Sequence, residues 1–257
     1  MVNLLRKLRK KMHGDMHARM DNLEEKINII MKMVCKPEDE LSVLCDIYGS
    51  DKGSVNNLKL AHTYTTVYHD IFKDIRNNVK SVFECGIGTN NPKLPSTMGI
   101  GGRPGASLRV WRDYFKNAIV VGGDIDKDIL FEEERIYTDF IDQLKPEVIN
   151  YFFQSLPDEC PKKFDIMIDD GLHTFEANIC LFQNAFKYLN QDGLYIIEDV
   201  HLDYMQKMQE YLKTCKDSDS ISVEYKFLGT QWVGKTKWNA PWKSDSNMVI
   251  IQRKKYF

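Results

Sequence analysis

Four short apolar segments of the sequence each end in acidic residues. They are residues 81–84, 119–124, 164–170 and 194–199. Helices are expected at residues 38–47, 64–72, 107–115 and 175–189. Strands that alternate with amphipathic helices predict a mainly parallel α/β sheet covered on both faces. Because ligands bind beyond the carboxyl ends of the strands in such a sheet, we expect the acids to gather at one ligand-binding edge.

Two further strand-like segments, residues 221–228 and 247–253, stand at the end of the sequence. No helix is expected between them, so the two strands must run antiparallel to each other. The loop that joins them contains Trp232, Trp238 and Trp242. Tryptophans in a polar loop are typical of interfaces and of platforms for sugars or rings, although ordinary loop packing explains them equally well.

Composition and charge limit the classes of protein to which this chain can belong. The chain has 257 residues, enough for one sizeable α/β domain with an extension. Its 35 basic and 37 acidic side chains give no global electrostatic footprint for nucleic acid. No apolar run reaches the length of a membrane span, and no signal-peptide core is present. The six cysteines form no C-x-x-C pair, so we expect a cytoplasmic protein with reduced thiols.

Residues 1–36 form a separate segment. Leucine, isoleucine, valine and methionine recur every three or four positions from Leu5 to Val34, as on one face of a helix. The stripe is rich in methionine and poor in aromatic residues, which favours contact with protein over contact with lipid. We therefore expect an amphipathic helix, packed on its own domain or forming a homo-oligomer, before a folded domain at residues 37–257.

A glycine turn follows the first strand. Residues 84–88 read Glu-Cys-Gly-Ile-Gly, and the two glycines allow the backbone to turn tightly against a ligand. Asn90 and Asn91 stand where a third glycine would complete a dinucleotide fingerprint, which disfavours NAD. Asp124 ends the next strand and suits a bidentate hydrogen bond to ribose hydroxyls. A plain tight turn with Asp124 as a helix cap is the alternative, but the two features together favour a ligand.

These motifs resemble a known family. The run ECGIG is similar to motif I of class I S-adenosylmethionine (SAM)-dependent methyltransferases, and GGDID is similar to their ribose-binding motif II. The pair IDDGLH and YIIEDVH resembles the metal-dependent sugar O-methyltransferases of macrolide and polysaccharide modification, the mycinamicin type. The resemblance covers residues 45–253. It implies a Rossmann-like fold with a seven-stranded, mostly parallel sheet behind the N-terminal helical extension.

The resemblance also implies a set of SAM contacts. In chain order they are Lys52, Tyr64, Glu84, Gly86, Gly88, Asp124, Asp142 and Gln143. The methionine part would meet Glu84 and the two glycines, and its carboxylate would lie near Lys52 or Tyr64. Asp124 would bind the ribose, while Asp142 and Gln143 would lie at the edge of the adenine. For Lys52 and Tyr64, a capped turn and a packed helix are equally good explanations.

The implied metal ligands are Asp170, Glu198 and Asp199, which would bind Mg²⁺ or Mn²⁺. Physical chemistry supports such a site, because crowded carboxylates repel one another unless a hard cation neutralises them. A cation also acidifies a bound hydroxyl, whose proton a histidine can accept. His173 is the implied base, and Asp170 stands beside it, three residues earlier. A helix-capping histidine is the alternative.

Other polar residues near the motifs carry weaker expectations. Asp169 is expected to be structural or adjacent to the cofactor rather than a metal ligand, because neighbouring strand residues point to opposite faces. His201 is a weaker catalytic candidate than His173. The long loop at residues 90–105 could form a lid or a substrate wall. Arg103 and Arg109 could meet a phosphate or a carboxylate there, although Arg109 could equally be a surface residue.

We therefore expect a Mg²⁺-dependent, SAM-dependent O-methyltransferase. Its substrate would be a hydroxyl of a sugar, a polysaccharide precursor or a similar small polar metabolite. A phosphate or phosphoramidate oxygen of a capsule-type sugar precursor is a close variant, since it also suits a hard metal. The alternatives are another metal enzyme on the same fold and a non-catalytic assembly protein. SAM binding would argue against the first, and an assembly protein would tolerate loss of the three carboxylates.

Overall fold

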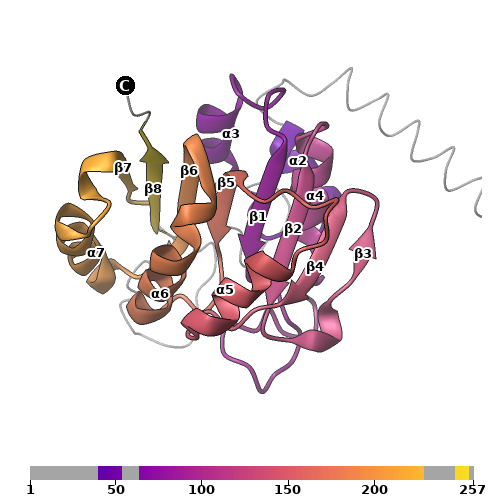
Figure 1. The fold of residues 1–257 in the computed structure, drawn as a ribbon. Coiled ribbons are helices and arrows are strands. Elements are labelled where there is room, and N and C mark those ends of the chain that lie inside the picture. Colours follow the sequence, from indigo (N-terminus) through magenta and orange to yellow (C-terminus); the bar gives the residue numbers. More distant parts are fainter. Residues whose placement is uncertain (1–39, 54–63, 229–246, 255–257) are drawn as a thin grey trace, which may run out of the picture. The chain divides into compact units, whose positions relative to one another are not determined.

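The computed structural model describes residues 40–53, 64–228 and 247–254 (Figure 1). The chain divides into two compact units, Met1–Glu40 and Leu41–Phe257, and the second contains the sheet. The predicted helix at residues 1–36 and the tryptophan-bearing loop lie outside the described residues. No helix in the described ranges is long and apolar enough to cross a membrane.

Within these ranges eight strands form one sheet, in the order β3-β4-β2-β1-β5-β6-β8-β7. The strands are β1 (Ser81–Cys85), β2 (Ile119–Asp124), β3 (Glu132–Glu133), β4 (Ile136–Phe140), β5 (Phe164–Asp169), β6 (Leu189–Val200), β7 (Ile221–Lys226) and β8 (Asn247–Arg253). Strand β1 is central, with parallel neighbours β2 and β5. Strand β8 runs antiparallel to β6 and to β7. The predicted Rossmann-like α/β class and the antiparallel final pair are confirmed.

Two details of the sheet differ from expectation. The described sheet has eight strands instead of seven. It contains two strands beyond the six expected segments: β4, and β3, in which Glu132 and Glu133 pair antiparallel with β4. Both glutamates are exposed, so the apolar alternation that marks a strand is missing there. Strand β6 begins at Leu189 rather than Leu194, and its register with β5 shifts over this stretch. Asp192 and Gly193 therefore lie inside an irregular strand, and the helix expected to reach residue 189 ends at Ala185.

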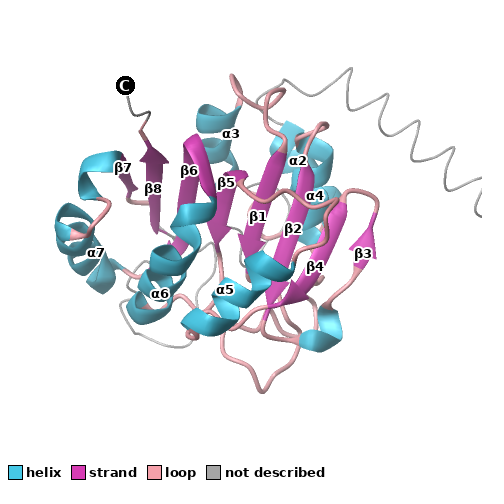
Figure 2. Cartoon of the chain, in the orientation of Figure 1, coloured by secondary structure: helices cyan, strands magenta, loops and turns pink. Residues whose placement is uncertain are grey.

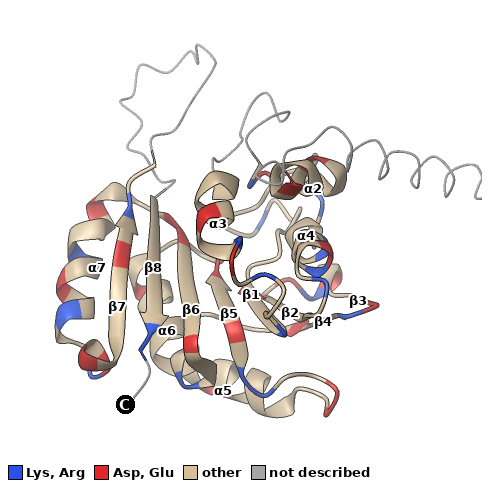
Figure 3. Ribbon diagram, turned by 90° about the horizontal axis from the view of Figure 1, so that it is seen from above, with Lys and Arg blue, Asp and Glu red and all other residues tan. Residues whose placement is uncertain are grey.

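Helices cover both faces of the sheet (Figure 2). In the view of Figure 3, α2 (Glu40–Tyr48), α3 (Tyr64–Phe72) and α4 (Ala106–Tyr114) lie on one side of the strands. The other side carries α5 (Pro146–Ser155), α6 (Phe175–Ala185) and α7 (Leu202–Thr214). Successive strand residues alternate between the two cores: Val82 packs with the first set of helices and Phe83 with the second. Burial on both faces explains the continuous apolar runs in the sequence.

Aromatic side chains fix α3 against α4. Tyr68 stacks on Phe72 with 5.1 Å between ring centroids, and it meets Trp111 edge-on, also at 5.1 Å. All three side chains are fully buried. This packing holds the hydroxyl groups of Tyr64 and Tyr68 against acids at the carboxyl end of β6.

The turn after β1 passes very close to the loop after β5. Gly86 has φ +85°, and a Cβ there would lie 2.0 Å from the carbonyl oxygen of Asp170. The Gly86 N–H donates to the Gly123 carbonyl, and the Asp170 N–H donates to the Cys85 carbonyl, both at 2.8 Å. Gly86 is therefore required because the backbone of the loop after β5 passes against it, whether or not a ligand also approaches.

Replacing Gly86 by alanine should destabilise the fold, because the new Cβ meets backbone and the left-handed conformation disfavours alanine. We expect Gly86→Ala to lower the free energy of unfolding by about 2 kcal/mol or more. Gly101→Ala is the matched control, since nothing lies within 4 Å of its added Cβ. Its cost should stay within about 0.5 kcal/mol in urea unfolding. Equal costs would contradict the close approach of the two loops.

Candidate active site

A cavity of about 780 Å³ opens beyond the carboxyl ends of β1, β2, β5 and β6. Its volume is within the usual range for small-molecule sites. The predicted site residues that line it are Lys52, Tyr64, Gly86, Gly88, Asp124, Asp142, Gln143, Asp170, His173, Glu198 and Asp199. Glu84 is absent from this wall. Most of the residues predicted from the strand ends therefore line a single cavity.

Asp124 organises the end of the cavity next to the glycine turn. Its Oδ2 accepts a hydrogen bond from the Ile87 N–H, and its Oδ1 accepts one from the Asp126 N–H, both at 2.8 Å. Each carboxylate oxygen has a second lone pair, so Asp124 can hold the turn and still accept from ribose hydroxyls. The role of Asp124 in holding the glycine turn was not predicted.

Two apolar side chains at the same end were missed by the sequence analysis. Ile125 is 48% exposed and Leu144 is 50% exposed, yet both line the cavity. Each directly follows a predicted polar contact, Asp124 or Gln143. The available signal is an apolar residue directly after a predicted polar contact, because in a solvated loop such a side chain has no core to enter.

Gln143 braces two loops. Its Nε2 donates to Asp169 Oδ1 at 2.5 Å, and its Oε1 accepts from the Leu172 N–H at 2.9 Å. The neighbouring Asp142 is paired with Lys145 Nζ at 2.8 Å. The contacts of Asp142 and Gln143 with adenine remain predictions, and the bracing role of Gln143 is an addition to them.

Asp169 points away from the cavity and is fully buried. It accepts from the amide of Gln143 and from Asn178 Nδ2 at 2.9 Å. Burial raises the pKa of Asp169 to about 6, even though both amides favour the ionised form. As expected from strand alternation, Asp169 is a structural acid, and it fixes the start of the loop that carries Asp170 and His173.

Beyond the carboxyl ends of β1, β5 and β6, Lys52 lies among three carboxylates. Its Nζ is 2.5 Å from Glu198 Oε2, 2.6 Å from Asp170 Oδ2 and 3.4 Å from Glu84 Oε1. Burial alone would lower the pKa of Lys52, but Asp170, Glu198 and Glu84 together raise it well above its ordinary value. Tyr68 donates to the other oxygen of Glu198, so both oxygens of that carboxylate are engaged.

Glu84 lies beneath this end of the cavity. It is fully buried, and its Oε2 accepts from Ser107 Oγ at 2.7 Å and from Trp111 Nε1 at 3.0 Å. Burial raises the pKa of Glu84 to about 7, against the opposing effects of Lys52 and the two donors. The predicted contact of Glu84 with methionine stays untested, and the structure gives this residue a role in anchoring α4 to β1.

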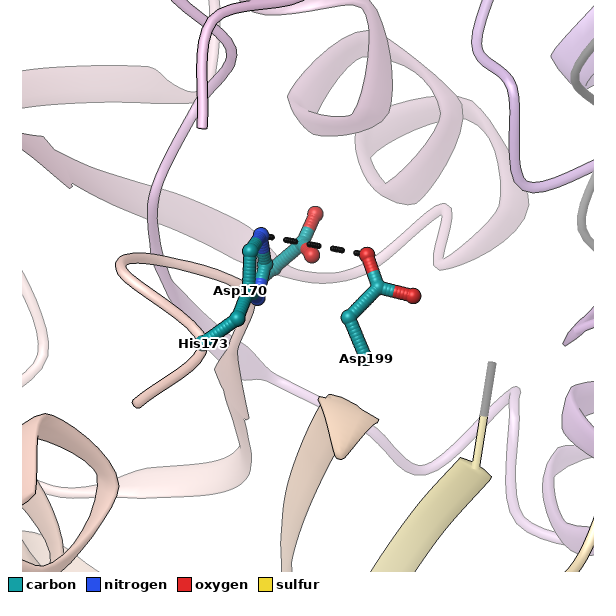
Figure 4. Close-up of side chains that lie close together, drawn as sticks. All are labelled: Asp170, His173 and Asp199. Carbon is teal, nitrogen blue, oxygen red and sulfur yellow. Dashed lines mark ion pairs between the residues drawn. The ribbon is translucent and has the colours of Figure 1, made fainter. Parts of the chain in front are cut away.

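Asp170, His173 and Asp199 point towards a common space (Figure 4). Each offers one ligand atom, and these atoms lie within 4.8 Å of one another. His173 Nε2 is 3.8 Å from Asp199 Oδ2, and Tyr64 donates to Asp199 Oδ1. His173 and Asp199 have φ values of +59° and +51°, a conformation that is rare outside glycine and is typical of functional sites.

The predicted metal ligands are therefore divided in the structure. Asp170 and Asp199 stand with His173, whereas Glu198 faces Lys52 and Tyr68 instead. Sequence reasoning placed Lys52 near a cofactor carboxylate, and the structure places its ammonium against three protein carboxylates. Lys52 precedes β1, so spacing along the strands carried no signal for this contact.

The weaker candidates lie outside the cavity wall. Arg109 Nη2 pairs with Glu133 Oε1 at 2.6 Å and ties α4 to β3, and Arg103 is exposed. His201 is the N-cap of α7, where its Nδ1 accepts from the Asp203 N–H at 3.2 Å. The loop at residues 90–105 does contribute a wall, through residues 94–98 and its glycines 101 and 102.

The chain matches no model of a known protein family. It is 31% identical over 162 residues to the 8-demethyl-8-alpha-L-rhamnosyl tetracenomycin-C 2'-O-methyltransferase of Streptomyces olivaceus, covering 63% of this chain and 38% of that protein. It is 32% identical over 143 residues to the mycinamicin VI 2''-O-methyltransferase of Micromonospora griseorubida, covering 56% and 33%. The chain thus aligns with less than two fifths of the length of either relative.

Among solved structures, the MycE methyltransferase from the mycinamycin biosynthetic pathway in complex with Mg and SAH is 26% identical. The match covers 86% of this chain and 55% of that chain, with a TM-score of 0.57. These comparisons confirm the resemblance to sugar O-methyltransferases that the motifs indicated.

The buried Glu84 should make stability depend on pH. Its pKa rises from 4.5 to about 7 on folding, so its contribution to stability is present below pH 4.5 and is lost as the pH rises to about 7. Glu84→Gln removes this titration while keeping an acceptor for Ser107 and Trp111. As the pH rises from 4.5 to about 7, the free energy of unfolding of Glu84→Gln should increase relative to that of the wild type by up to about 3 kcal/mol. A pH-independent difference in urea unfolding would contradict this placement.

Proposed function

We propose that this chain is a SAM-dependent, Mg²⁺-dependent O-methyltransferase that acts on a hydroxyl of a sugar, a polysaccharide precursor or a similar small polar metabolite. The observation that carries the proposal is that one cavity joins two sets of residues. Asp124 and the glycine turn line the wall beyond β1 and β2, the first end, and Asp170, His173 and Asp199 line the wall beyond β5 and β6, the second end. The two ends meet where Gly86 approaches Asp170. The similarity to sugar O-methyltransferases supports the same reaction class.

The first end of the cavity fits SAM, which when bound supplies a methyl group on a positively charged sulfur. The backbone of the Gly86–Gly88 turn forms the wall against which the methionine part would lie. Asp124 keeps free lone pairs for the ribose hydroxyls. Ile125 and Leu144 offer exposed apolar surface beside them, which suits a flat heterocycle better than it suits water.

The second end fits a hard divalent cation, because carboxylate oxygens are the donors that Mg²⁺ prefers. Asp170 and Asp199 would hold the ion, with Glu198 as the third predicted ligand. When bound, Mg²⁺ would make an acceptor hydroxyl easier to deprotonate. The residue that takes the proton is His173. Its Nε2 lies 3.8 Å from Asp199 Oδ2, on the side of the ring that faces the space where the acceptor hydroxyl would lie.

A sugar hydroxyl is favoured over a phosphate or phosphoramidate oxygen. Within the described part of the cavity wall, the basic side chains are those of Lys52 and His173. Lys52 is already paired with acids, and Arg109 is paired with Glu133 on the far side of α4. An anionic acceptor would therefore meet mainly carboxylates, whereas a neutral hydroxyl avoids that repulsion.

The proposal also includes the cellular location, the class of acceptor and the oligomeric state. The described cysteines, Cys45, Cys85, Cys160, Cys180 and Cys215, are free thiols, which supports a reducing, cytoplasmic location. The acceptor is a small molecule or a sugar in this proposal, with no role for nucleic acid. A homo-oligomer built through residues 1–36 remains a prediction, because that segment lies outside the described residues.

Calorimetric titration with SAM and with S-adenosylhomocysteine tests the cofactor. We expect micromolar binding by the wild type and its loss in Asp124→Ala, because this acid both holds the turn and meets the ribose. Asp128→Ala is the control, since this exposed acid lies four residues away and outside the cavity wall. Its affinity should match that of the wild type. Failure of the wild type to bind either ligand would exclude the proposed reaction.

Substitution of His173 tests the base. In His173→Asn, transfer of a labelled methyl group to a panel of sugars and sugar nucleotides should fall by about 10²- to 10⁴-fold, while SAM affinity stays unchanged. His201→Asn, which keeps an N-cap side chain, should retain activity close to that of the wild type. EDTA should abolish the wild-type reaction and excess Mg²⁺ should restore it. Undiminished transfer by His173→Asn would rule out the assigned base.

A further inference from the structure

Lys52 occupies a position where a cation is required. Its side chain is 3% exposed, and its Nζ lies within 2.6 Å of one oxygen each of Asp170 and Glu198. Glu84 approaches from below at 3.4 Å. The three acids come from the ends of β5, β6 and β1, so the ammonium sits at the centre of the sheet's carboxyl edge. Without it, three carboxylates with little access to water would repel one another.

The oxygens that hold Lys52 belong to two of the three predicted metal ligands. Both oxygens of Glu198 already have a partner: Lys52 Nζ lies 2.5 Å from Oε2, and Tyr68 donates to Oε1. Asp170 gives Oδ2 to Lys52 and faces His173 and Asp199 with the same carboxyl group. A divalent cation bound by Asp170 and Glu198 would lie beside the Lys52 ammonium, which is within 2.6 Å of both carboxylates, and the two positive charges would repel each other.

We infer that Lys52 is the resident cation of the Asp170–Glu198 pair and exchanges with the divalent metal. The inference rests on the proposed function for the identity of the metal. When the metal binds, the Lys52 side chain leaves the carboxylates and enters the cavity, whose wall it already lines. Glu198 then becomes free to join Asp170 and Asp199. Lys52 is thus a positioning residue that keeps the acids together before the metal arrives and competes with the metal for them.

The wild-type protein offers a direct test through the reactivity of its lysines. Acetylation by an N-hydroxysuccinimide ester, followed by peptide mass spectrometry, reports whether each amine can be reached. In EDTA, Lys52 should be protected by burial, and saturating Mg²⁺ should raise its labelling rate by about tenfold or more. The exposed Lys116 and Lys163 should label equally in both conditions. Sodium chloride at matched ionic strength controls for screening.

A variant gives the second readout. Lys52→Met removes the competitor, so calorimetric Mg²⁺ titration should show a dissociation constant roughly tenfold lower than that of the wild type. The metal-free variant should unfold at a lower temperature, and Mg²⁺ should raise that temperature more than it does for the wild type. Lys145→Met is the matched control, because Lys145 pairs with a cavity acid, Asp142, but is 58% exposed. Its Mg²⁺ affinity should equal the wild-type value.

The possible results distinguish failure of the proposed exchange between Lys52 and the metal from failure of the proposed methyl transfer. Mg²⁺ binding that leaves Lys52 labelling unchanged would overturn the exchange, and so would weaker Mg²⁺ binding by a folded Lys52→Met. If Lys52→Met does not fold, the labelling of the wild type decides alone. SAM binding without any Mg²⁺ binding by wild type or variant would overturn the exchange and the metal requirement together, while leaving SAM binding itself established.

Discussion

Folding removes the carboxylates of Glu84, Asp169 and Glu198 from water, and the arrangement of the site depends on how each of them is compensated. Burying an ionisable acid costs free energy unless donors or a counter-charge replace the lost water. Glu84 accepts from two side chains of α4, and Asp169 accepts from Gln143 and α6. Glu198 has Lys52 and Tyr68. Each buried acid thereby joins its strand to a different neighbouring element, and these connections set the shape of the cavity.

One of these connections runs between the two ends of the cavity. Gln143 holds Asp169 with its amide nitrogen and the backbone of Leu172 with its oxygen. Asp170 directly follows Asp169, and His173 directly follows Leu172, at the end where we place the reacting groups. Gln143 itself lines the end where we place the adenine. A molecule that orders Gln143 would therefore also order the loop that carries the base, which links cofactor occupancy to the geometry of the second end.

The fold and the gathering of the acids could be predicted because they follow from local patterns. Alternating strands and helices determine the sheet, and a residue that ends a parallel strand must lie at its carboxyl edge, as Asp124 and Asp170 do. The strand β3 could not be predicted, because it is extended only through its pairing with β4. The contact of Lys52 with Glu198 joins residues 146 positions apart, and no periodicity reaches over that distance. Both surprises are interactions of tertiary structure that local pattern does not encode.

The origin of Lys52 has a consequence for where the functional domain begins. The sheet starts at Ser81, and the three acids that contact Lys52 follow that position, but their counter-charge stands before it. During synthesis Lys52 and Tyr68 leave the ribosome long before β6 supplies Glu198. The Lys52 ammonium, which precedes β1, can therefore pair with Glu198 only after β6 has been synthesised. A fragment cut at the first strand would keep Glu84, Asp170 and Glu198 and lose the Lys52 ammonium that holds them together. The smallest autonomous unit of this protein thus extends upstream of its sheet, to include α2 and α3.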